Sequence, residues 1–305
     1  MSLTAGDLDR IIWIKETAYG VTPTGVWNNG PEPSNLVPTD NLNQSEDYLS
    51  GSRSQRMSAC VSQRRDAGFK LSSVEQARAD WISPLLVGAL GIATGTEPLG
   101  DLPSYSMIYK VGDSRKLYNG CKVNSLRISA SEPKAVVAFD SDVWAQYSDD
   151  VTFSTPNYII AGLQNVTLGT FPTATELAGL QVTPPVLFGA SRVNPLSWSI
   201  DIANNLERGK GSVTGADTIE YPVSPALHEG RRSIIYECEL YLDDLTYLDA
   251  VLVNSDAPTV SFGLGGVTLT LSDGKYIADG SENFKFEQNP MKQKLRMRFE
   301  TATIS

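Results

Sequence analysis

Short segments in which apolar and polar residues alternate make up most of this 305-residue sequence. Residues 291–302 show the pattern most clearly, because the run Leu295-Arg296-Met297-Arg298-Phe299 changes character at every step. Alternation with a period of two places one face of an extended strand in a core and the other in water, which is typical of antiparallel sheets. Gly, Pro, Asn and Asp fill the gaps between segments. The sequence therefore predicts a mainly β fold.

The predicted strands fall into two series. They are 36–44, 68–72, 105–111, 120–130 and 134–144, and then 196–203, 233–241, 260–264, 267–271, 283–287 and 291–302. Residues 73–90 and 243–253 instead carry apolar residues at intervals of three and four after a Ser or Asp cap, which predicts one short helix in each series. Pro84 is expected to kink or shorten the first helix.

The two series share their order of elements, which predicts an internal duplication. Each has a strand, a long polar loop, a strand, a helix and further strands. We expect an N-terminal arm over 1–35, a first β domain over 36–150, a linker over 151–190 with a short strand near 166–168, and a second β domain over 191–305. The predicted fold class is two tandem antiparallel β-sandwich or barrel domains, each with one short helix.

Composition excludes several classes of function. His228 is the one histidine. This disfavours catalytic relays that use an imidazole base and excludes multi-histidine metal sites. Cys60, Cys121 and Cys238 form no C-x-x-C pair, and we expect them to be small buried residues. The formal net charge of −10 disfavours a nucleic-acid reader, although a surface past which DNA slides remains compatible with it. We expect no signal peptide, because the first residues are acidic where a leader carries positive charge, and no apolar run is long enough for a membrane span.

Candidate catalytic motifs are weak. The run Gly209-Lys210-Gly211-Ser212 lacks the spacing of a phosphate loop, and the glycines at 263, 265 and 266 lie between two strand patterns, where a hairpin turn is favoured. Acidic pairs such as Asp140 with Asp142 flank turns and lack calcium-loop spacing. We expect no enzyme activity, no cofactor and no metal.

Two long polar loops, 45–65 and 204–231, are the most unusual segments, because loops of this length in compact domains are usually functional or disordered. Each carries several basic residues. We interpret them as arms that become ordered on another subunit, and the alternative is a pair of mobile surface hairpins. The candidate inter-subunit contacts in and near these loops are Tyr19, Tyr48, Arg53, Arg56, Arg64, Arg65, Arg208, Lys210, Arg231 and Arg232.

Three short motifs in order carry a family resemblance. They are residues 15–23 (KETAYGVTP), residues 68–72 (GFKLS) before the first helix, and residues 118–129 (YNGCKVNSLRIS). Residues 203–206 (ANNL) and 230–232 (GRR) fit more loosely. The chain resembles the major tail tube proteins of long-tailed, siphovirus-type bacteriophages, most clearly over residues 11–147.

The resemblance implies a structural virion protein. Its β domains would join those of neighbouring subunits into a barrel around a lumen, and the rings would stack into the tube through which the genome is ejected. Two such domains per chain favour a homotrimer with a pseudo-hexameric ring, and a hexamer is the alternative. The expected partners are further copies, the tape measure and terminator proteins, and DNA in passage without specific binding, but no membrane. Assembly is expected in the host cytoplasm and residence in the virion tail.

Two other interpretations stay open. One is a different tube component, such as a tail terminator or the tube of a contractile injection system. The other is a carbohydrate-binding β-sandwich module, in which Trp27, Trp144 and Tyr147 would stack on sugars.

Overall fold

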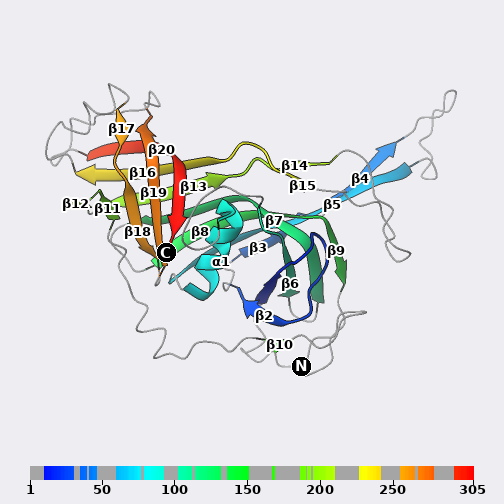
Figure 1. Cartoon of the computed structure of the whole chain (residues 1–305). Coiled ribbons are helices and arrows are strands. Elements are labelled where there is room, and N and C mark those ends of the chain that lie inside the picture. Colours follow the sequence, from blue (N-terminus) through cyan, green and yellow to red (C-terminus); the bar gives the residue numbers. More distant parts are fainter. Residues whose placement is uncertain are drawn as a thin grey trace.

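A computed structural model describes residues 10–30, 35–39, 41–46, 60–76, 79–92, 102–111, 114–131, 136–150, 167–168, 186–189, 191–193, 195–209, 227–241, 255–264, 267–277 and 292–305. Over these ranges the protein is mainly β, with one α-helix (Figure 1). Apart from the small β14–β15 pair, the described strands belong to one hydrogen-bonded network. The mainly β fold expected from the alternating sequence pattern is therefore confirmed.

The first half contains nine strands and the helix. These are β1 (Arg10–Lys15), β2 (Val26–Asn29), β3 (Asn35–Pro38), β4 (Asn41–Glu46), β5 (Cys60–Gln76), α1 (Ala79–Leu90), β6 (Tyr105–Val111), β7 (Ser114–Ser131), β8 (Val136–Ala145) and β9 (Tyr147–Asp150).

The remaining described strands follow from residue 167. These are β10 (Thr167–Leu168), β11 (Val186–Phe188), β12 (Ser191–Val193), β13 (Ser197–Ala203), β14 (Glu207–Arg208), β15 (Leu227–His228), β16 (Ser233–Tyr241), β17 (Asp256–Ala257), β18 (Val260–Leu264), β19 (Val267–Tyr276) and β20 (Lys292–Ile304).

Eight strands form what we call the central sheet, in the order β3-β5-β8-β7-β13-β16-β20-β19, with every neighbouring pair antiparallel. Its first four strands come from the first half of the chain and its last four from the second half (Figure 1). The halves meet where β7 pairs with β13, from Ser125 opposite Ala203 to Ser131 opposite Ser197. We call this the seam.

The order of strand pairing is the same in both halves. In the first half it runs β2-β1-β6-β7-β8-β5-β3, and in the second half β12-β11-β18-β19-β20-β16-β13, again with every pair antiparallel. A strand of one half therefore has a definite counterpart in the other: β3 matches β13, β5 matches β16, β7 matches β19 and β8 matches β20.

One face of the central sheet is apolar and forms the core. The inward-facing residues of the strands at the seam are almost wholly buried, as with Leu126, Ile128, Ile200 and Ile202. Helix α1 contacts β7 and β13 on either side of the seam and also reaches β19 and β20 (Figure 1). Its Leu86 is 0 % exposed. The helix therefore packs against both halves at the point where they join.

The helix is shorter than predicted. Residues 73–76 continue β5 and pair with residues 136–139 of β8, so the helix begins only at Ala79. The hydrogen bonds offered by β8 outweigh a local serine cap, because ladder pairing satisfies the same backbone groups. Pro84 lies inside the helix, which continues to Leu90. The predicted helix at 243–253 and the predicted strand at 283–287 lie outside the described residues.

Residues 10–30 of the expected N-terminal arm are part of the folded body. β1 pairs along its length with β6, and Ile11, Ile12 and Trp13 are buried. The two long loops are also partly ordered as strands: Asn41–Glu46 pairs with residues 60–66 of β5, and β14 pairs with β15. In β1 the burial of apolar side chains decided the structure. In the two loops, the β4–β5 and β14–β15 backbone pairings outweighed the polar composition from which loops were expected. The proposed domain boundaries themselves stay a prediction.

Candidate functional site

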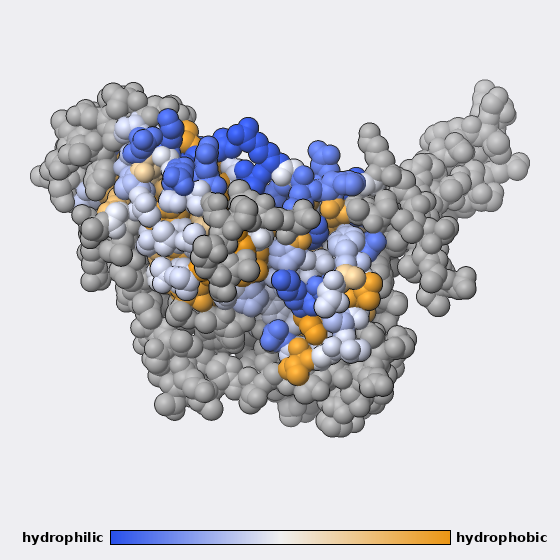
Figure 2. Space-filling model, viewed as in Figure 1, coloured by the Kyte–Doolittle hydropathy of each residue, from blue (hydrophilic) through white to orange (hydrophobic). Residues whose placement is uncertain are grey.

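The second face of the central sheet is polar and carries rows of charged residues. One row follows the strand register from β5 to β19 through Ser72, Asp140, Arg127, Asp201, Ile235, Arg298 and Lys275. Figure 2 shows hydrophilic residues gathered along the upper rim of the molecule, where β16, β14 and β15 lie in Figure 1. Helix α1 covers the apolar face of the sheet, so it leaves this polar face uncovered.

Opposite charges pair between neighbouring strands at two places on the polar face. Arg127 Nη1 lies 3.4 Å from Asp201 Oδ1 across the seam. On the next strands Glu237 receives Lys294 at 2.9 Å and Arg296 at 3.1 Å. Partial burial raises the pKa of Asp201, and Arg127 opposes that shift. The net charge of the whole chain is therefore not concentrated on the described part of this face.

A groove crosses the polar face beside the seam. It is lined by residues of β3, β5, β8, β7 and β13, among them Val37, Lys70, Arg127, Asp140 and Asp201. Val37 is 46 % exposed although it is a large apolar residue on a strand. The groove therefore ends, at β3, in an apolar edge that no other described strand covers.

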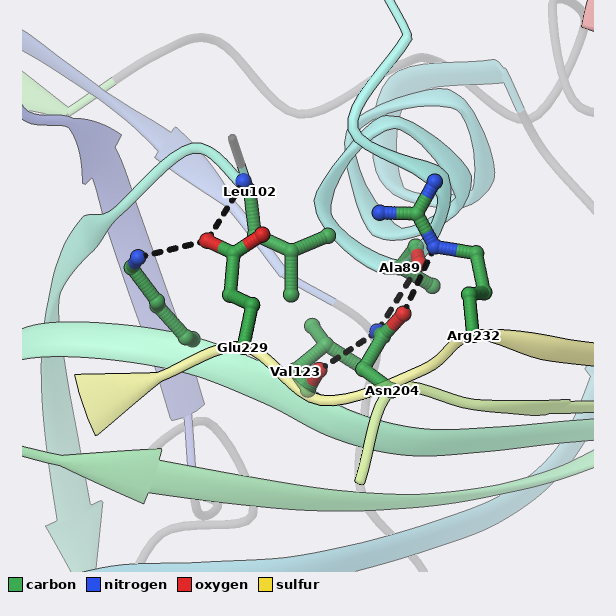
Figure 3. A network of polar contacts seen from close by, with 7 residues as sticks. Ala89, Leu102, Val123, Asn204, Glu229 and Arg232 are labelled. Atoms are coloured by element: carbon green, nitrogen blue, oxygen red, sulfur yellow. Dashed lines mark hydrogen bonds and ion pairs between the residues drawn. The ribbon is translucent and has the colours of Figure 1, made fainter. Parts of the chain in front are cut away.

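A buried asparagine fastens the second half of the chain to the first (Figure 3). Asn204 follows β13 and is 1 % exposed. Its Nδ2 donates to the carbonyl oxygens of Ala89 in α1 and Val123 in β7, at 2.9 and 2.8 Å. Its Oδ1 accepts from Nε of Arg232 at 2.8 Å. One amide thus joins a helix, a strand of the first half and the start of β16.

Glu229 makes a second set of contacts between the two halves, beside Asn204 (Figure 3). Its Oε1 accepts from Nζ of Lys122 and from the backbone N–H of Leu102, both at 2.7 Å. Burial lowers the pKa of Arg232, and Glu229 opposes the shift. The next residue, Gly230, has no room for a side chain, because a Cβ there would collide with the carbonyl oxygen of Asn205. The close approach of these two segments requires glycine.

Arg208 in β14 completes the contact. Its guanidinium donates to the carbonyl oxygens of Ala145 at 3.0 Å and Ala67 at 2.7 Å, and its Nε lies 3.4 Å from Asp66 Oδ1. The guanidinium carbon also lies 4.9 Å from the ring centre of Trp144. The planar, five-donor group therefore binds two strands of the first half at once. We call residues 204–209 and 227–232 the second-half arm base.

The resemblance motif at residues 15–23 has a structural role. Glu16 is 7 % exposed, and its carboxylate accepts hydrogen bonds from Gly20 N, Ser106 Oγ and Gly120 N. Tyr19 packs beside the cluster of Leu102, Leu206 and Leu227 at the second-half arm base. Burial raises the pKa of its phenol. The motif therefore closes the turn after β1 and supports the arm base.

The expected inter-subunit contacts divide into three groups. Tyr19, Arg208 and Arg232 make the contacts within the chain that are described above, and Arg231 is exposed, with its carbonyl oxygen accepting from Asn205 Nδ2. Arg64 and Arg65 lie in β5 opposite Asn43 and Leu42. Tyr48, Arg53, Arg56 and Lys210 lie outside the described residues. As contacts to another subunit all ten stay a prediction.

Sequence reasoning did not select Asn204, Glu229, Lys122, Arg127 or Asp201 as site residues. The Asn204-Asn205 pair gave a signal, because Asn205 adopts a positive φ of 49° that asparagine tolerates better than most residues. Two partners of Asn204, Val123 and Ala89, lie more than 80 residues away in the sequence. No local pattern identifies such partners.

Other candidates from the sequence have ordinary surroundings. His228 is exposed and pairs with Glu207 in the β14–β15 hairpin. Cys121 and Cys238 are buried free thiols as expected, and burial raises the pKa of Cys238 to about 12. Within the described ranges, no group of acidic, Cys or His side chains is arranged to hold a metal. In the same ranges no helix is both long and apolar enough to cross a membrane.

The aromatic residues offered for sugar stacking are used inside the molecule where their side chains are described. Trp27 is 1 % exposed. Trp144 donates its indole N–H to Asp142 Oδ2 at 2.9 Å and lies against Arg208. A flat exposed aromatic platform is therefore not formed by this pair.

Comparison with known proteins gives one result. The family model of the phage tail tube protein matches residues 7–291, and no individual curated protein matches the chain. The match covers every described strand except β20, and all of the second-half arm base. The chain therefore belongs to the phage tail tube protein family, whose members are structural components of the virion tail.

Proposed function

We propose that three copies of this chain close into a ring of six similar β units, and that such rings stack into the tail tube of a long-tailed phage. The repeated order of strand pairing carries the proposal. At the seam, one β unit already extends the sheet of another through β7 and β13. The same kind of junction between copies would continue the central sheet around a closed barrel.

The number of copies follows from the number of units in each chain. β3 and β19 end the central sheet in one chain, and they are the counterparts of β13 and β7 at the seam. A ring of three chains repeats the intramolecular junction three times and adds three junctions between copies. Closure also pairs exposed strand edges, which removes a common cause of uncontrolled aggregation. A ring of six single-unit proteins would be built in the same way, so a chain with two units needs half as many copies.

The polar face would then line the lumen, because α1 and the core occupy the opposite face of the sheet. The genome leaving the virion would pass a wall on which Arg127 pairs with Asp201, while Lys294 and Arg296 share Glu237. DNA binding through phosphates requires unpaired basic groups that displace counterions. A wall of internal ion pairs therefore allows passage without adhesion. A tape measure protein would fill this lumen before ejection, and a terminator protein would end the tube.

Electron microscopy of the purified protein tests this function. We expect negatively stained tubes with a central channel, and image averages with threefold symmetry and six similar lobes per ring. Rings with six whole chains would contradict the trimer. A preparation that contains only single subunits under all assembly conditions would contradict the tube.

A further inference from the structure

We propose that β17 covers, in the single subunit, the edge of β19 that receives β3 of a second copy, and that β17 leaves this edge when a ring closes. This inference rests on the proposed ring. The partner is a second copy of this chain, and the interaction surface is the backbone edge of residues 274–277. The inference follows from comparing the two halves position by position.

The start of the seam has a counterpart at β3. The sequence from the last residue of β13, Ala203-Asn204-Asn205-Leu206, resembles the sequence directly after β3, Thr39-Asp40-Asn41-Leu42. The backbone agrees, since Thr39 N donates to Gly68 O and Ala203 lies opposite Ser233, so that each ends its strand at the start of the arm. Thr39 is therefore the counterpart of Ala203, and Val37 is the counterpart of Asp201.

The partner strand can be aligned in the same way. Lys70 lies two residues after Gly68 and faces Asp142, while Ile235 lies two residues after Ser233 and faces Arg298. Across the next pair, Asp142 faces Ser125 and Arg298 faces Lys275. Lys275 is thus the counterpart of Ser125, and Ile277 is the counterpart of Arg127.

These equivalences give the register of the junction between copies. At the seam Ser125 faces Ala203 and Arg127 faces Asp201. Between copies Lys275 would face Thr39, and Ile277 would face Val37. The ion pair of the seam is replaced by two apolar residues. Val37 is 46 % exposed in the single chain, and Ile277 is half-buried, so the junction gives both side chains an apolar neighbour.

β17 occupies this edge in the single chain. Asp256 lies opposite Lys275 and Ala257 opposite Gly274, and Tyr276 N donates to Ser255 O at 3.2 Å. β17 directly precedes β18, which pairs with the same edge of β19 farther along. A copy of β3 placed by analogy with β13 needs the backbone groups that β17 now uses.

The contact of β17 is small enough to be exchanged. It has two residues, and its ion pair between Asp256 and Lys275 spans 3.8 Å with side chains 88 % and 63 % exposed. Exposed pairs of this kind contribute little to stability. An incoming β3 would place Val37 and Pro38 opposite Ile277 and Tyr276. Pro38 has no N–H, but its carbonyl oxygen can accept from Tyr276 N in place of Ser255 O, and the exchange adds the apolar contact of Val37 with Ile277.

The first half already shows the exchanged arrangement. Leu102 lies three residues before β6, as Ala257 lies three residues before β18. Leu102 does not pair with β7 in the described structure, because β13 holds that edge. Instead Leu102 N donates to Glu229 of the second-half arm base. In one chain, therefore, the edge of β19 is covered by β17 of the same half, whereas the equivalent edge of β7 pairs with β13 of the other half. Covering a free edge in the subunit also prevents premature pairing.

A reversible tether tests the exchange. In a Cys60→Ser background, the pair Asp256→Cys and Lys275→Cys lies on opposed positions and can lock β17 onto β19 by a disulfide. The control, Ser261→Cys with Thr270→Cys, is opposed on β18 and β19, where the two hydroxyls are 3.1 Å apart, and leaves the edge free. Tube growth is followed by light scattering and electron microscopy, oxidised and reduced.

We expect the oxidised β17 tether to slow tube growth at least tenfold, with recovery after reduction, while the oxidised control grows like the parent. Growth of the oxidised tether at the parental rate would overturn the inference. Failure of the parent and the control to form any tube would instead count against the proposed function.

A cross-link tests the register independently. Val37→Cys with Ile277→Cys should give covalent trimers in oxidised tubes and no cross-link in single subunits. Val37→Cys with Thr268→Cys is the control, because Thr268 faces Gly263 of β18 at the other end of the strand. Tubes in which the control cross-links as well as the test pair, or in which the test pair gives no covalent trimer, would contradict the register.

Discussion

At the scale of single residues, the buried Asn204 joins the two halves through three side-chain hydrogen bonds. Replacing it with alanine leaves the carbonyl oxygens of Ala89 and Val123 and the Arg232 Nε without this partner in a buried place. Because buried groups without partners lose their hydration, we expect Asn204→Ala to lower the free energy of unfolding by about 2–4 kcal/mol. Urea unfolding of the subunit measures this loss.

The matched control for Asn204 is Asn28→Ala, since Asn28 is exposed on β2. That variant should change the free energy of unfolding by about 0.5 kcal/mol or less. Equal losses of unfolding free energy in the two variants would show that the contacts of Asn204 stabilise the protein no more than those of an exposed asparagine.

Glu16 is the corresponding residue in the N-terminal motif. Glu16→Ala removes the acceptor for Gly20 N, Ser106 Oγ and Gly120 N. We expect a loss of about 2–4 kcal/mol, because three donors lose a charged partner in a largely buried site. Chemical unfolding checks the value, with the exposed Glu207→Ala as control. A loss no larger than that of the control would contradict a structural role for the motif.

At the scale of elements, the second-half arm base depends on the shape of one guanidinium. Arg208→Lys keeps the charge but cannot donate to Ala67 and Ala145 together while lying over Trp144. We expect backbone amides in 204–209 and 227–231 to exchange hydrogen at least tenfold faster, with β16 unchanged. Hydrogen-exchange mass spectrometry measures this.

Arg298→Lys is the control for the arm base, since Arg298 is exposed on β20. It should leave the exchange of both segments as in the parent. Faster exchange throughout the second half in Arg208→Lys would indicate general unfolding rather than release of the arm base.

At the scale of the whole molecule, β4 and the start of β5 extend away from the body as a two-stranded arm (Figure 1). Because this arm extends away from the body, whereas the second-half arm base lies on the neighbouring β unit of the same chain, we expect this arm to bind a different copy, in the next ring. Replacing residues 47–59 by a short Gly-Ser turn keeps the paired part of the arm. The variant should form single rings and at least tenfold fewer tubes in electron micrographs.

A matched replacement of residues 210–226 by the same turn shortens the loop between β14 and β15, whose base is held within the chain. This variant should form rings as the parent does, and comparison of its tube yield with that of the first replacement separates the two arms. Normal tubes from the 47–59 replacement would contradict a stacking role for the β4–β5 arm.

Local sequence patterns predicted the strands well where turn residues bound them on both sides. Residues 105–111, 233–241 and 260–264 form strands with the expected limits. Prediction failed where a distant partner decided the structure, as at 73–76, which pair with β8 instead of forming a helix. In the candidate site, the basic residues Arg208 and Arg232 were selected for their loops, but their partners were not.

The sequence by itself determined the mainly β class, because alternation is a property of neighbouring residues. The tertiary structure alone decided that the two halves share one central sheet, that Asn204 reaches α1 and β7, and that β17 covers the edge of β19. These features depend on hydrogen bonds between segments far apart in the chain. Backbone donors and acceptors are alike in every residue, so their partners are chosen by the packing of the whole sheet.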